Sequence, residues 1–218
     1  MLYIDFHTHN IPEAQDVVAV VDGRDTWGIH PWDSLSQPLE RSGESQHLIA
    51  SPSFKGVGEG LLAIGECGLD ALRGPSMDIQ EKVFLQQIHL SEEVGKPLVI
   101  HCVKSLDRLL LLRRQQHPTM PWMLHGFRGK PQQLSSLIKA GFYVSFGFGH
   151  NEESLCLCPI ERLMLETDES LCSIVELYKN VARKRGLEVA DLCHAMTENY
   201  KTFFRREPLP TLNTIDVC

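Results

Sequence analysis

The sequence predicts an α/β fold, a compact single-domain TIM-like (β/α) barrel with reduced N-terminal helices. Short apolar runs rich in β-branched residues alternate with longer amphipathic stretches, the pattern of repeated parallel βα units. The apolar runs are continuous rather than alternating in polarity, as in strands that are covered on both faces. Eight such runs lie within 218 residues, close to the lower size limit of about 200 for this barrel. One domain over residues 1–218 is therefore expected.

The expected strands begin and end with apolar or aromatic residues. They are Tyr3–Phe6, Val17–Val21, Trp27–Ile29, Leu62–Ile64, Leu98–Ile100, Trp122–Leu124, Tyr143–Phe146 and Leu163–Leu165.

Five segments between and after these strands have the apolar spacing of amphipathic helices. They are Gln80–Val94, Leu106–Gln116, Pro131–Ala140, Ser173–Arg185 and Val189–Phe204. The third opens with a proline and is followed by Gly141; proline in the first turn and glycine after the last turn are typical of helix ends. The N-terminal third is different. Asn10–Asp16 is too short for a crossover helix, and Ser34–Gly60, rich in Ser, Pro and Gly, is expected to be irregular or only partly helical.

Composition narrows the function classes. The formal net charge is −7 and there is no polybasic tract, which argues against binding to extended nucleic-acid duplexes. No apolar run is long enough for a membrane span, so no membrane partner is expected. The first ten residues lack a basic segment followed by an unbroken apolar run, so they do not resemble a signal peptide, and a cytoplasmic location is expected. The odd number of cysteines, seven, argues against a disulfide framework.

Potential metal ligands follow the expected strands. His7 and His9 follow the first, His30 the third, Glu66 the fourth, His101 the fifth, His125 the sixth and Asp168 the eighth. The carboxyl ends of barrel strands meet at one mouth, where active sites are built. A single histidine at a strand end is more often structural than a ligand, but so many at successive strand ends predict a site.

The ligand types and their number indicate metals. Residues two apart on a strand point to the same side, so His7 and His9 can reach one cation. Imidazole with carboxylate suits Zn²⁺ and Mn²⁺, and Mg²⁺ less well. Six residues exceed what one tetrahedral ion needs, so two divalent ions are expected: His7, His9, Glu66, His101, His125 and Asp168.

These residues stand in motifs that resemble the TatD family of metal-dependent hydrolases, in the family's order along the whole chain. The matching segments are IDFHTH (4–9), GIHPW (28–32), IGECGLD (64–70), KPLVIHC (96–102), LHGFRG (124–129), GFYVSFG (141–147), LMLETD (163–168) and ENYKTFF (198–204).

The resemblance implies a TIM-like barrel with a two-metal centre. In this interpretation His7, His9, Glu66 and Asp168 hold one ion, and Glu66 is shared with a second ion held by His101 and His125. Asp168 and Glu66 are the expected catalytic residues, with Asp168 as a general base for the attacking water. His30 is assigned to substrate contact or to bracing the site. The implied activity is 3′-5′ exonuclease cleavage of DNA or RNA ends.

The chain departs from the family pattern where substrate binds. Val103 stands where an Arg is usual, and Lys104 is the nearest cation. Arg128 stands where a small residue is usual and is a candidate phosphate contact. After Asp168 the family's substrate loop is missing, and the chain is shorter than typical members.

Three functions therefore stay open. The preferred one is a metal-dependent phosphodiesterase acting on nucleic-acid ends. The alternative is a two-metal hydrolase of a small phosphate or an aminoacyl-type ester, since PHP phosphoesterases also open with H-x-H, although GECGLD fits them poorly. The third is a non-catalytic binding barrel, which the complete ligand set disfavours.

Overall fold

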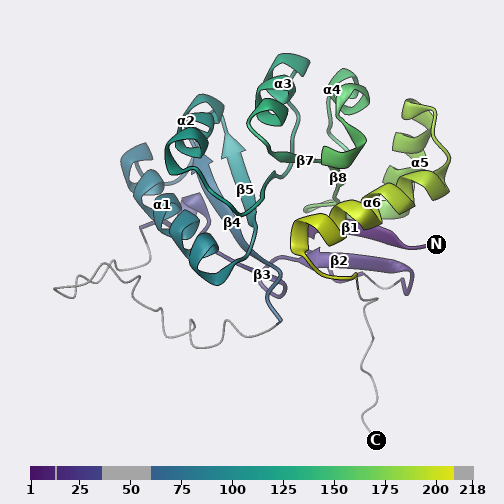
Figure 1. Cartoon of the computed structure of the whole chain (residues 1–218), viewed down its shortest axis with the longest axis horizontal. Helices are drawn as coiled ribbons and strands as arrows, with labels where there is room; N and C mark the ends of the chain where they lie inside the picture. The colour runs from purple at the N-terminus through teal and green to yellow at the C-terminus, as the bar shows by residue number, and fades with distance from the viewer. Residues whose placement is uncertain (13, 36–59, 209–218) are drawn as a thin grey trace, which may run out of the picture. The chain divides into compact units, whose positions relative to one another are not determined.

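The computed structural model describes the chain except residue 13, residues 36–59 and residues 209–218. It divides into two compact units, residues 1–22 with 125–218, and residues 23–124. Each unit is built from parallel strands and helices (Figure 1). The expectation of one domain over residues 1–218 stays a prediction.

The first unit holds the two ends of the described chain. Its elements are β1 (Tyr3–Thr8), β2 (Val17–Val21), α3 (Pro131–Lys139), β7 (Tyr143–Phe146), α4 (Glu152–Leu157), the 3-10 turn η3 (Ile160–Arg162), β8 (Leu163–Leu165), α5 (Ile174–Arg185) and α6 (Val189–Phe204). β1 pairs in parallel with β2, and β7 pairs in parallel with β8. A further bridge joins Thr8 to Asp168, so the end of β1 lies beside the segment that follows β8.

Two side chains from the last helices fasten these strands. The Tyr178 hydroxyl on α5 accepts from the Ile4 backbone N–H at 3.0 Å and donates to the Ile4 carbonyl at 2.9 Å. The Asn199 amide on α6 donates to the carbonyls of Ile160 and Leu163. Buried backbone groups need partners, and these contacts supply them at β1 and next to β8. The helices thus hold in place the two strands that lead to His7 and Asp168.

The second unit is a parallel sheet with helices beside it. Its elements are β3 (Thr26–Trp27), the 3-10 turn η1 (Pro31–Asp33), β4 (Ala63–Asp70), α1 (Met77–Val94), β5 (Leu98–Val103), α2 (Leu106–Gln116) and β6 (Trp122–Leu124). The strands lie in the order β3-β4-β5-β6. α1 packs on β4 and α2 on β5 (Figure 1).

Two buried glutamines on one face of α1 position the loops of this unit. The Gln87 side chain accepts from the Ile29 N–H at 2.6 Å and donates to the Ile29 carbonyl at 3.0 Å. One heptad earlier, Gln80 accepts from the Asp70 N–H and donates to the Asp70 carbonyl. Residues seven apart share a helix face. The helix therefore fixes both the segment that leads to His30 and the end of β4.

The strand and helix predictions are confirmed, with different boundaries. All eight expected strands are present, but β4 runs to Asp70 and β5 to Val103, so Glu66 and His101 lie within strands rather than after them. α1 begins three residues before the expected start, after Ser76. Within the described ranges, one α-helix was not predicted from the sequence: α4, whose N-cap Asn151 accepts from the Ser154 N–H at 2.9 Å.

The N-terminal part has few helices, as expected, where the structure describes it. Among the described residues, no α-helix precedes Met77. Most of the stretch Ser34–Gly60, expected to be irregular, lies outside the described residues.

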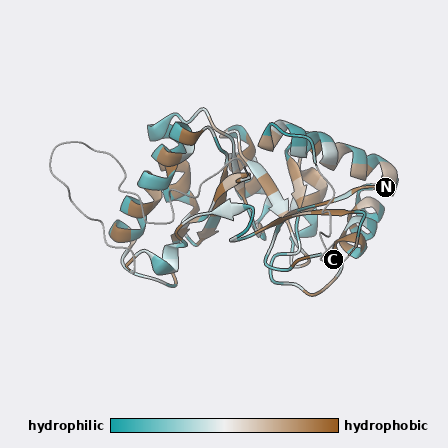
Figure 2. Ribbon diagram, turned by 90° about the horizontal axis from the view of Figure 1, so that it is seen from below, coloured by the Kyte–Doolittle hydropathy of each residue, from teal (hydrophilic) through white to brown (hydrophobic). Residues whose placement is uncertain are grey.

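The helices are amphipathic, which Figure 2 shows as brown and teal segments along the same helix. In α5, for example, Ile174, Leu177, Tyr178 and Val181 are buried at helical spacing. Within the described ranges, no helix has both the length and the apolar character needed to cross a membrane.

Candidate metal centre and its supporting residues

The first unit gathers three histidines and an aspartate. His7 Nε2 lies 3.7 Å and His9 Nε2 lies 3.6 Å from Asp168 Oδ1. The His125 ring lies 4.6 Å from the His7 ring, centroid to centroid. Ligand atoms of His7, His125 and Asp168 all lie within 4.8 Å of one another. His7 is fully buried, whereas Asp168 and His9 are partly open to solvent, so a cation with bound water fits this group.

Backbone pairing explains why residues so far apart in sequence meet here. The Asp168 N–H donates to the His7 carbonyl at 3.0 Å, and the His9 N–H donates to the Asp168 carbonyl at 3.1 Å. Asp168 has φ 55°, in the left-handed region that aspartate tolerates better than most residues. The two hydrogen bonds hold the Asp168 backbone in register with His7 and His9.

A buried carboxyl group supports the same segment. Asp5 Oδ1 accepts from the Thr167 N–H at 3.0 Å, and Asp5 Oδ2 accepts from the Thr167 hydroxyl at 2.7 Å. Burial raises the pKa of Asp5 to about 7, although the hydrogen bonds from Thr167 oppose the rise. These contacts fix the residue that immediately precedes Asp168.

Glu166 orients His125. The Glu166 side chain is fully buried; its Oε1 accepts from the Gly126 N–H and lies 3.6 Å from His125 Nδ1. Burial alone favours the neutral acid, but the hydrogen bond and positive charge from His125 and the charge of His7 outweigh it and lower the pKa of Glu166. A carboxylate behind one imidazole nitrogen fixes the ring and leaves the other nitrogen for a metal.

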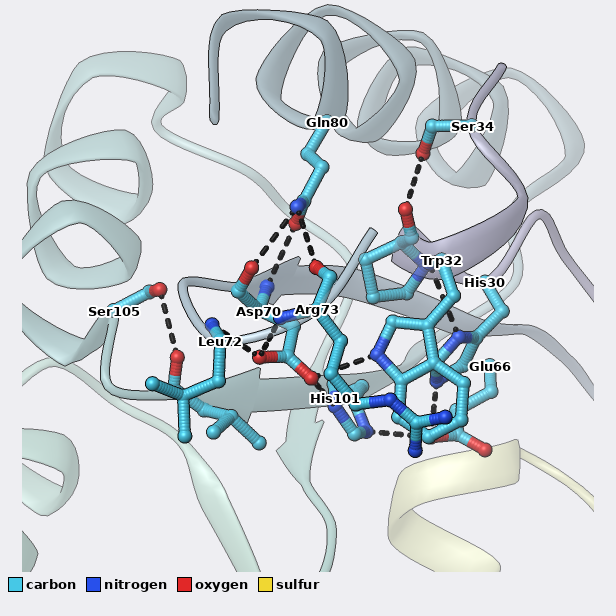
Figure 3. Close-up of polar contacts among 12 residues, drawn as sticks. His30, Trp32, Ser34, Glu66, Asp70, Leu72, Arg73, Gln80, His101 and Ser105 are labelled. Atoms are coloured by element: carbon cyan, nitrogen blue, oxygen red, sulfur yellow. Dashed lines mark hydrogen bonds and ion pairs between the residues drawn. The ribbon is translucent and has the colours of Figure 1, made fainter. Parts of the chain in front are cut away.

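The second unit has its own donor group around Glu66. His101 Nδ1 lies 2.9 Å and His30 Nε2 lies 3.3 Å from Glu66 Oε1. Figure 3 shows the three side chains turned toward one another, and their ligand atoms lie within 4.8 Å. The backbone is tight here: a Cβ at Gly68 would lie 2.0 Å from the His101 carbonyl oxygen, so only glycine fits, and its φ is +136°.

The two histidines of this group face different partners with their second nitrogens. His30 Nδ1 accepts from the Trp32 backbone N–H at 3.3 Å. A neutral imidazole that accepts at Nδ1 carries its proton on Nε2, so His30 donates toward Glu66 rather than offering a lone pair. His30 therefore suits a bracing role better than metal ligation, although distance alone groups it with the ligands.

His101, by contrast, has a carboxylate on its far side. Its Nε2 lies 3.3 Å from Asp70 Oδ2, an atom that also accepts from the Trp32 indole N–H at 2.7 Å. Burial raises the pKa of Asp70, but the hydrogen bonds from Trp32, the Leu72 N–H and His101 outweigh it and lower the pKa overall. An ionised Asp70 accepts the proton on His101 Nε2, so Nδ1, 2.9 Å from Glu66 Oε1, can present its lone pair to a cation beside Glu66.

The structure thus brings the predicted ligands together within each unit. His7, His9, His125 and Asp168 form one group, and Glu66 and His101 form the other with His30. The resemblance assigned His125 to the ion of Glu66 and His101; that assignment, like the shared role of Glu66, stays a prediction.

The two basic residues predicted to bind substrate lie on exposed loops. Lys104 follows β5 with φ 52°. Arg128 follows β6, and its guanidinium covers Gly149, whose Cβ would lie 3.1 Å away. Neither has a carboxylate partner in the part of the chain that the structure describes. Their role in substrate binding stays a prediction.

Sequence reasoning gave no role to Asp70, Glu166 or Trp32. Asp70 and Glu166 stand inside motifs that were noted, IGECGLD and LMLETD. Their position near a strand end was the available signal. No sequence pattern could show that Trp32 reaches Asp70, since that contact depends on the turn η1.

Comparisons with known proteins agree along the chain. The family profile described as TatD related DNase matches residues 7–205. A protein of Erwinia billingiae named 3′-5′ ssDNA/RNA exonuclease TatD is 32% identical over 207 residues, covering 83% of this chain and 77% of its own. Its namesake in Escherichia fergusonii is 27% identical over 206 residues, covering 82% and 76%. The metal-dependent hydrolase YcfH of Escherichia coli, called uncharacterized, is 27% identical over 199 residues, covering 81% and 72%.

Solved structures share the fold. The TatD homolog YJJV from Escherichia coli matches with a TM-score of 0.69 at 18% identity, over 89% of this chain and 79% of its own. A TatD family hydrolase from Entamoeba histolytica matches with a TM-score of 0.69 at 18% identity, over 87% and 75%. The predicted TIM-barrel-like α/β fold class is thereby confirmed.

Proposed function

The chain belongs to the TatD family of metal-dependent hydrolases, and from this membership we propose that it removes nucleotides from the 3′ end of single-stranded DNA or RNA. The observation that carries the proposal is the arrangement of His7 and His9 around Asp168, held by backbone hydrogen bonds. Relatives named as 3′-5′ exonucleases support the choice of substrate.

The donor groups fit divalent cations. Imidazole and carboxylate atoms converge, and a carboxylate stands behind both His101 and His125, as is usual for metal-binding histidines. We assign one ion to His7, His9 and Asp168 and one to Glu66 and His101, with His125 completing the set. Zn²⁺ or Mn²⁺ suits these donors better than Mg²⁺. Such ions supply Lewis acidity, which lowers the pKa of water and stabilises charge on a phosphoryl oxygen.

The side chains of this protein can accept the proton of the attacking water and keep the metal-binding residues oriented. Asp168 is partly open to solvent, so its carboxylate can accept a proton from the attacking water as general base. Glu66 is kept oriented by the N–H of His30, and His101 Nδ1 lies 2.9 Å from the same carboxylate oxygen, so one cation could contact both. Asp70 and Glu166 hold His101 and His125 in fixed orientations, which limits the reorganisation needed during the reaction.

A second candidate is hydrolysis of a small phosphate or an aminoacyl-type ester. The net charge of −7 favours it, because a negative surface repels a long polyanion. The segment after Asp168 adds no cation, as it reads Glu169-Ser170-Leu171-Cys172.

The test compares end-labelled single-stranded DNA and RNA, incubated with Mn²⁺ or Mg²⁺, against a chelator. We expect a metal-dependent ladder that shortens from the 3′ end. Asp168→Asn should abolish the ladder, while the same substitution at the exposed Asp191 in the first turn of α6 should leave it unchanged.

Absence of cleavage under either metal would contradict the exonuclease assignment. Hydrolysis of nitrophenyl phosphates or aminoacyl esters would then support the second candidate. Failure to bind metal and to hydrolyse any of these substrates would favour a non-catalytic binding protein.

A further inference from the structure

We propose that Arg73, held flat against the indole of Trp32, is a phosphate-binding residue that grips an anionic oxygen of the substrate beside Glu66 and His101. The proposal deepens the proposed function and rests on it, because it identifies the substrate class as a phosphate diester or monoester.

The backbone of Arg73 is fixed by the residues that position the donor group. Asp70 Oδ1 accepts from the N–H groups of Leu72 and Arg73 at 2.8 and 3.2 Å. The Gln80 amide donates to the Arg73 carbonyl at 3.0 Å. Because Asp70 Oδ2 faces His101, one carboxylate orients both the metal ligand and the loop that carries Arg73.

The loop is also pressed against η1. Gly74 has φ +88°, and a Cβ there would lie 2.9 Å from the Pro31 carbonyl oxygen and 3.0 Å from the Trp32 Cα. A side chain at this position would push the loop away from Trp32. The close approach therefore sets where the arginine side chain can lie.

The guanidinium is stacked and not neutralised. Its central carbon lies 3.7 Å from the centroid of the Trp32 ring, and Figure 3 shows the side chain drawn across the indole. Arg73 is exposed, and among the described residues no carboxylate forms an ion pair with it. Stacking uses a face of the guanidinium and leaves the N–H groups at its edge available.

The Trp32 indole, over which this guanidinium lies, also contacts the two histidines of the Glu66 donor group. The Trp32 ring lies 4.5 Å from the His30 ring and 5.8 Å from the His101 ring, between centroids, in edge-to-face contacts. Its N–H is tied to Asp70 at 2.7 Å, so the ring cannot rotate freely. The guanidinium is thus held against a ring that itself contacts His30 and His101.

The chemistry of the group points to phosphate. A guanidinium edge presents parallel N–H donors that match two oxygens of a phosphate. A neutral acyl ester has no anionic oxygen, so it cannot offset the conformational entropy lost when the arginine side chain is ordered. The arrangement therefore favours substrates with a phosphate over aminoacyl-type esters.

The test uses the Mn²⁺-loaded protein with inorganic phosphate as the probe, measured by titration calorimetry. Arg73→Met should weaken phosphate binding about 10- to 100-fold, as expected for loss of hydrogen bonds to a charged group. Arg73→Lys keeps the positive charge but loses the parallel N–H donors of the guanidinium, so it should lose part of the affinity for phosphate. On single-stranded oligonucleotides Arg73→Met should raise KM more than it lowers kcat.

The matched control is Arg113→Met. Arg113 also lies over a tryptophan of the same unit, 4.9 Å from the Trp122 centroid, but it belongs to α2 and donates to the Met120 carbonyl at 3.4 Å. This variant should bind phosphate as the unmodified protein does.

Unchanged phosphate affinity in a folded Arg73→Met variant would overturn the proposal, and equal losses in Arg73→Met and Arg113→Met would do the same. Thermal unfolding of each variant identifies one that has lost its fold; Arg73→Lys then decides. Failure of the exonuclease assignment is recognised separately, because the unmodified protein would then leave oligonucleotides intact while phosphate binding still reports on Arg73.

Discussion

The contact between Asp70 and His101 yields the sharpest prediction. Asp70→Asn keeps the size of the side chain but removes one of its two acceptor oxygens. In the structure Oδ2 serves the Trp32 indole N–H and His101 Nε2, and Oδ1 serves two backbone N–H groups. Whichever way the amide is turned, its NH₂ group meets donors that have lost their acceptor. We expect His101 to lose its fixed proton position.

The magnitude follows from these contacts. Removal of a carboxylate behind a metal-binding histidine lowers metal affinity by about 10- to 100-fold, equivalent to about 1.4 to 2.7 kcal/mol. Each donor left without an acceptor in a buried place costs about 1–3 kcal/mol of folding free energy. Asp70 is buried, so the free energy of unfolding should also fall by a few kcal/mol at most, which is the cost of leaving about two donors without an acceptor.

The assay is calorimetric titration of chelator-treated protein with Mn²⁺ and with Zn²⁺, together with urea unfolding. The control is Asp78→Asn, an exposed aspartate in the first turn of α1, which should bind metal as the unmodified protein does. If Asp70→Asn binds every ion with unchanged dissociation constants, Asp70 does not orient a metal ligand and the reasoning is refuted.

Three further substitutions test the framework around the site. Gly68→Ala should destabilise the protein by at least about 2 kcal/mol in urea unfolding and weaken metal binding, because its methyl group would collide with the backbone of β5; unchanged stability would contradict the close approach. Tyr178→Phe should cost about 2 to 4 kcal/mol, since the Ile4 N–H and carbonyl both lose a buried partner; a cost near zero would mean that water replaces the hydroxyl. For Asp5, the folded-state pKa of about 7 lies above the ordinary carboxyl pKa of 3.8, so the unmodified protein loses stability as the pH rises between these values. Relative to Asp5→Asn the loss should reach about 4 kcal/mol, at about 1.4 kcal/mol per pH unit, in metal-free protein; parallel pH profiles would argue against it.

Much of the fold was predictable because buried parallel strands leave a strong pattern. Continuous apolar runs located every strand in the part of the chain that the structure describes, and the helix α6 was predicted with its observed bounds, Val189–Phe204. Strand ends were less predictable: Glu66 and His101 are polar, yet their backbones continue β4 and β5. An apolar pattern cannot show that a strand continues through polar residues.

The candidate ligands were predicted from their position and residue type, whereas the residues that contact them were not predicted. His7, His9 and Asp168 were recognisable because strand alternation and strand ends are local properties of the sequence. Asp70, Glu166 and Trp32 act through contacts between separate segments, so residue type alone gives them no role. His30 shows the same limit, since its hydrogen bond to the Trp32 N–H, which indicates donation to Glu66, requires the turn η1.

The backbone hydrogen bonds between β1 and the segment after β8 impose an order on assembly. His7 and His9 are synthesised before Asp168, which completes their group and follows 159 residues after His9. Closing so long a loop is entropically costly and contributes to slow folding. A nascent or truncated chain that stops before β8 therefore has the two histidines without their carboxylate. Tight metal binding in this unit should begin only when the last strand has joined the first.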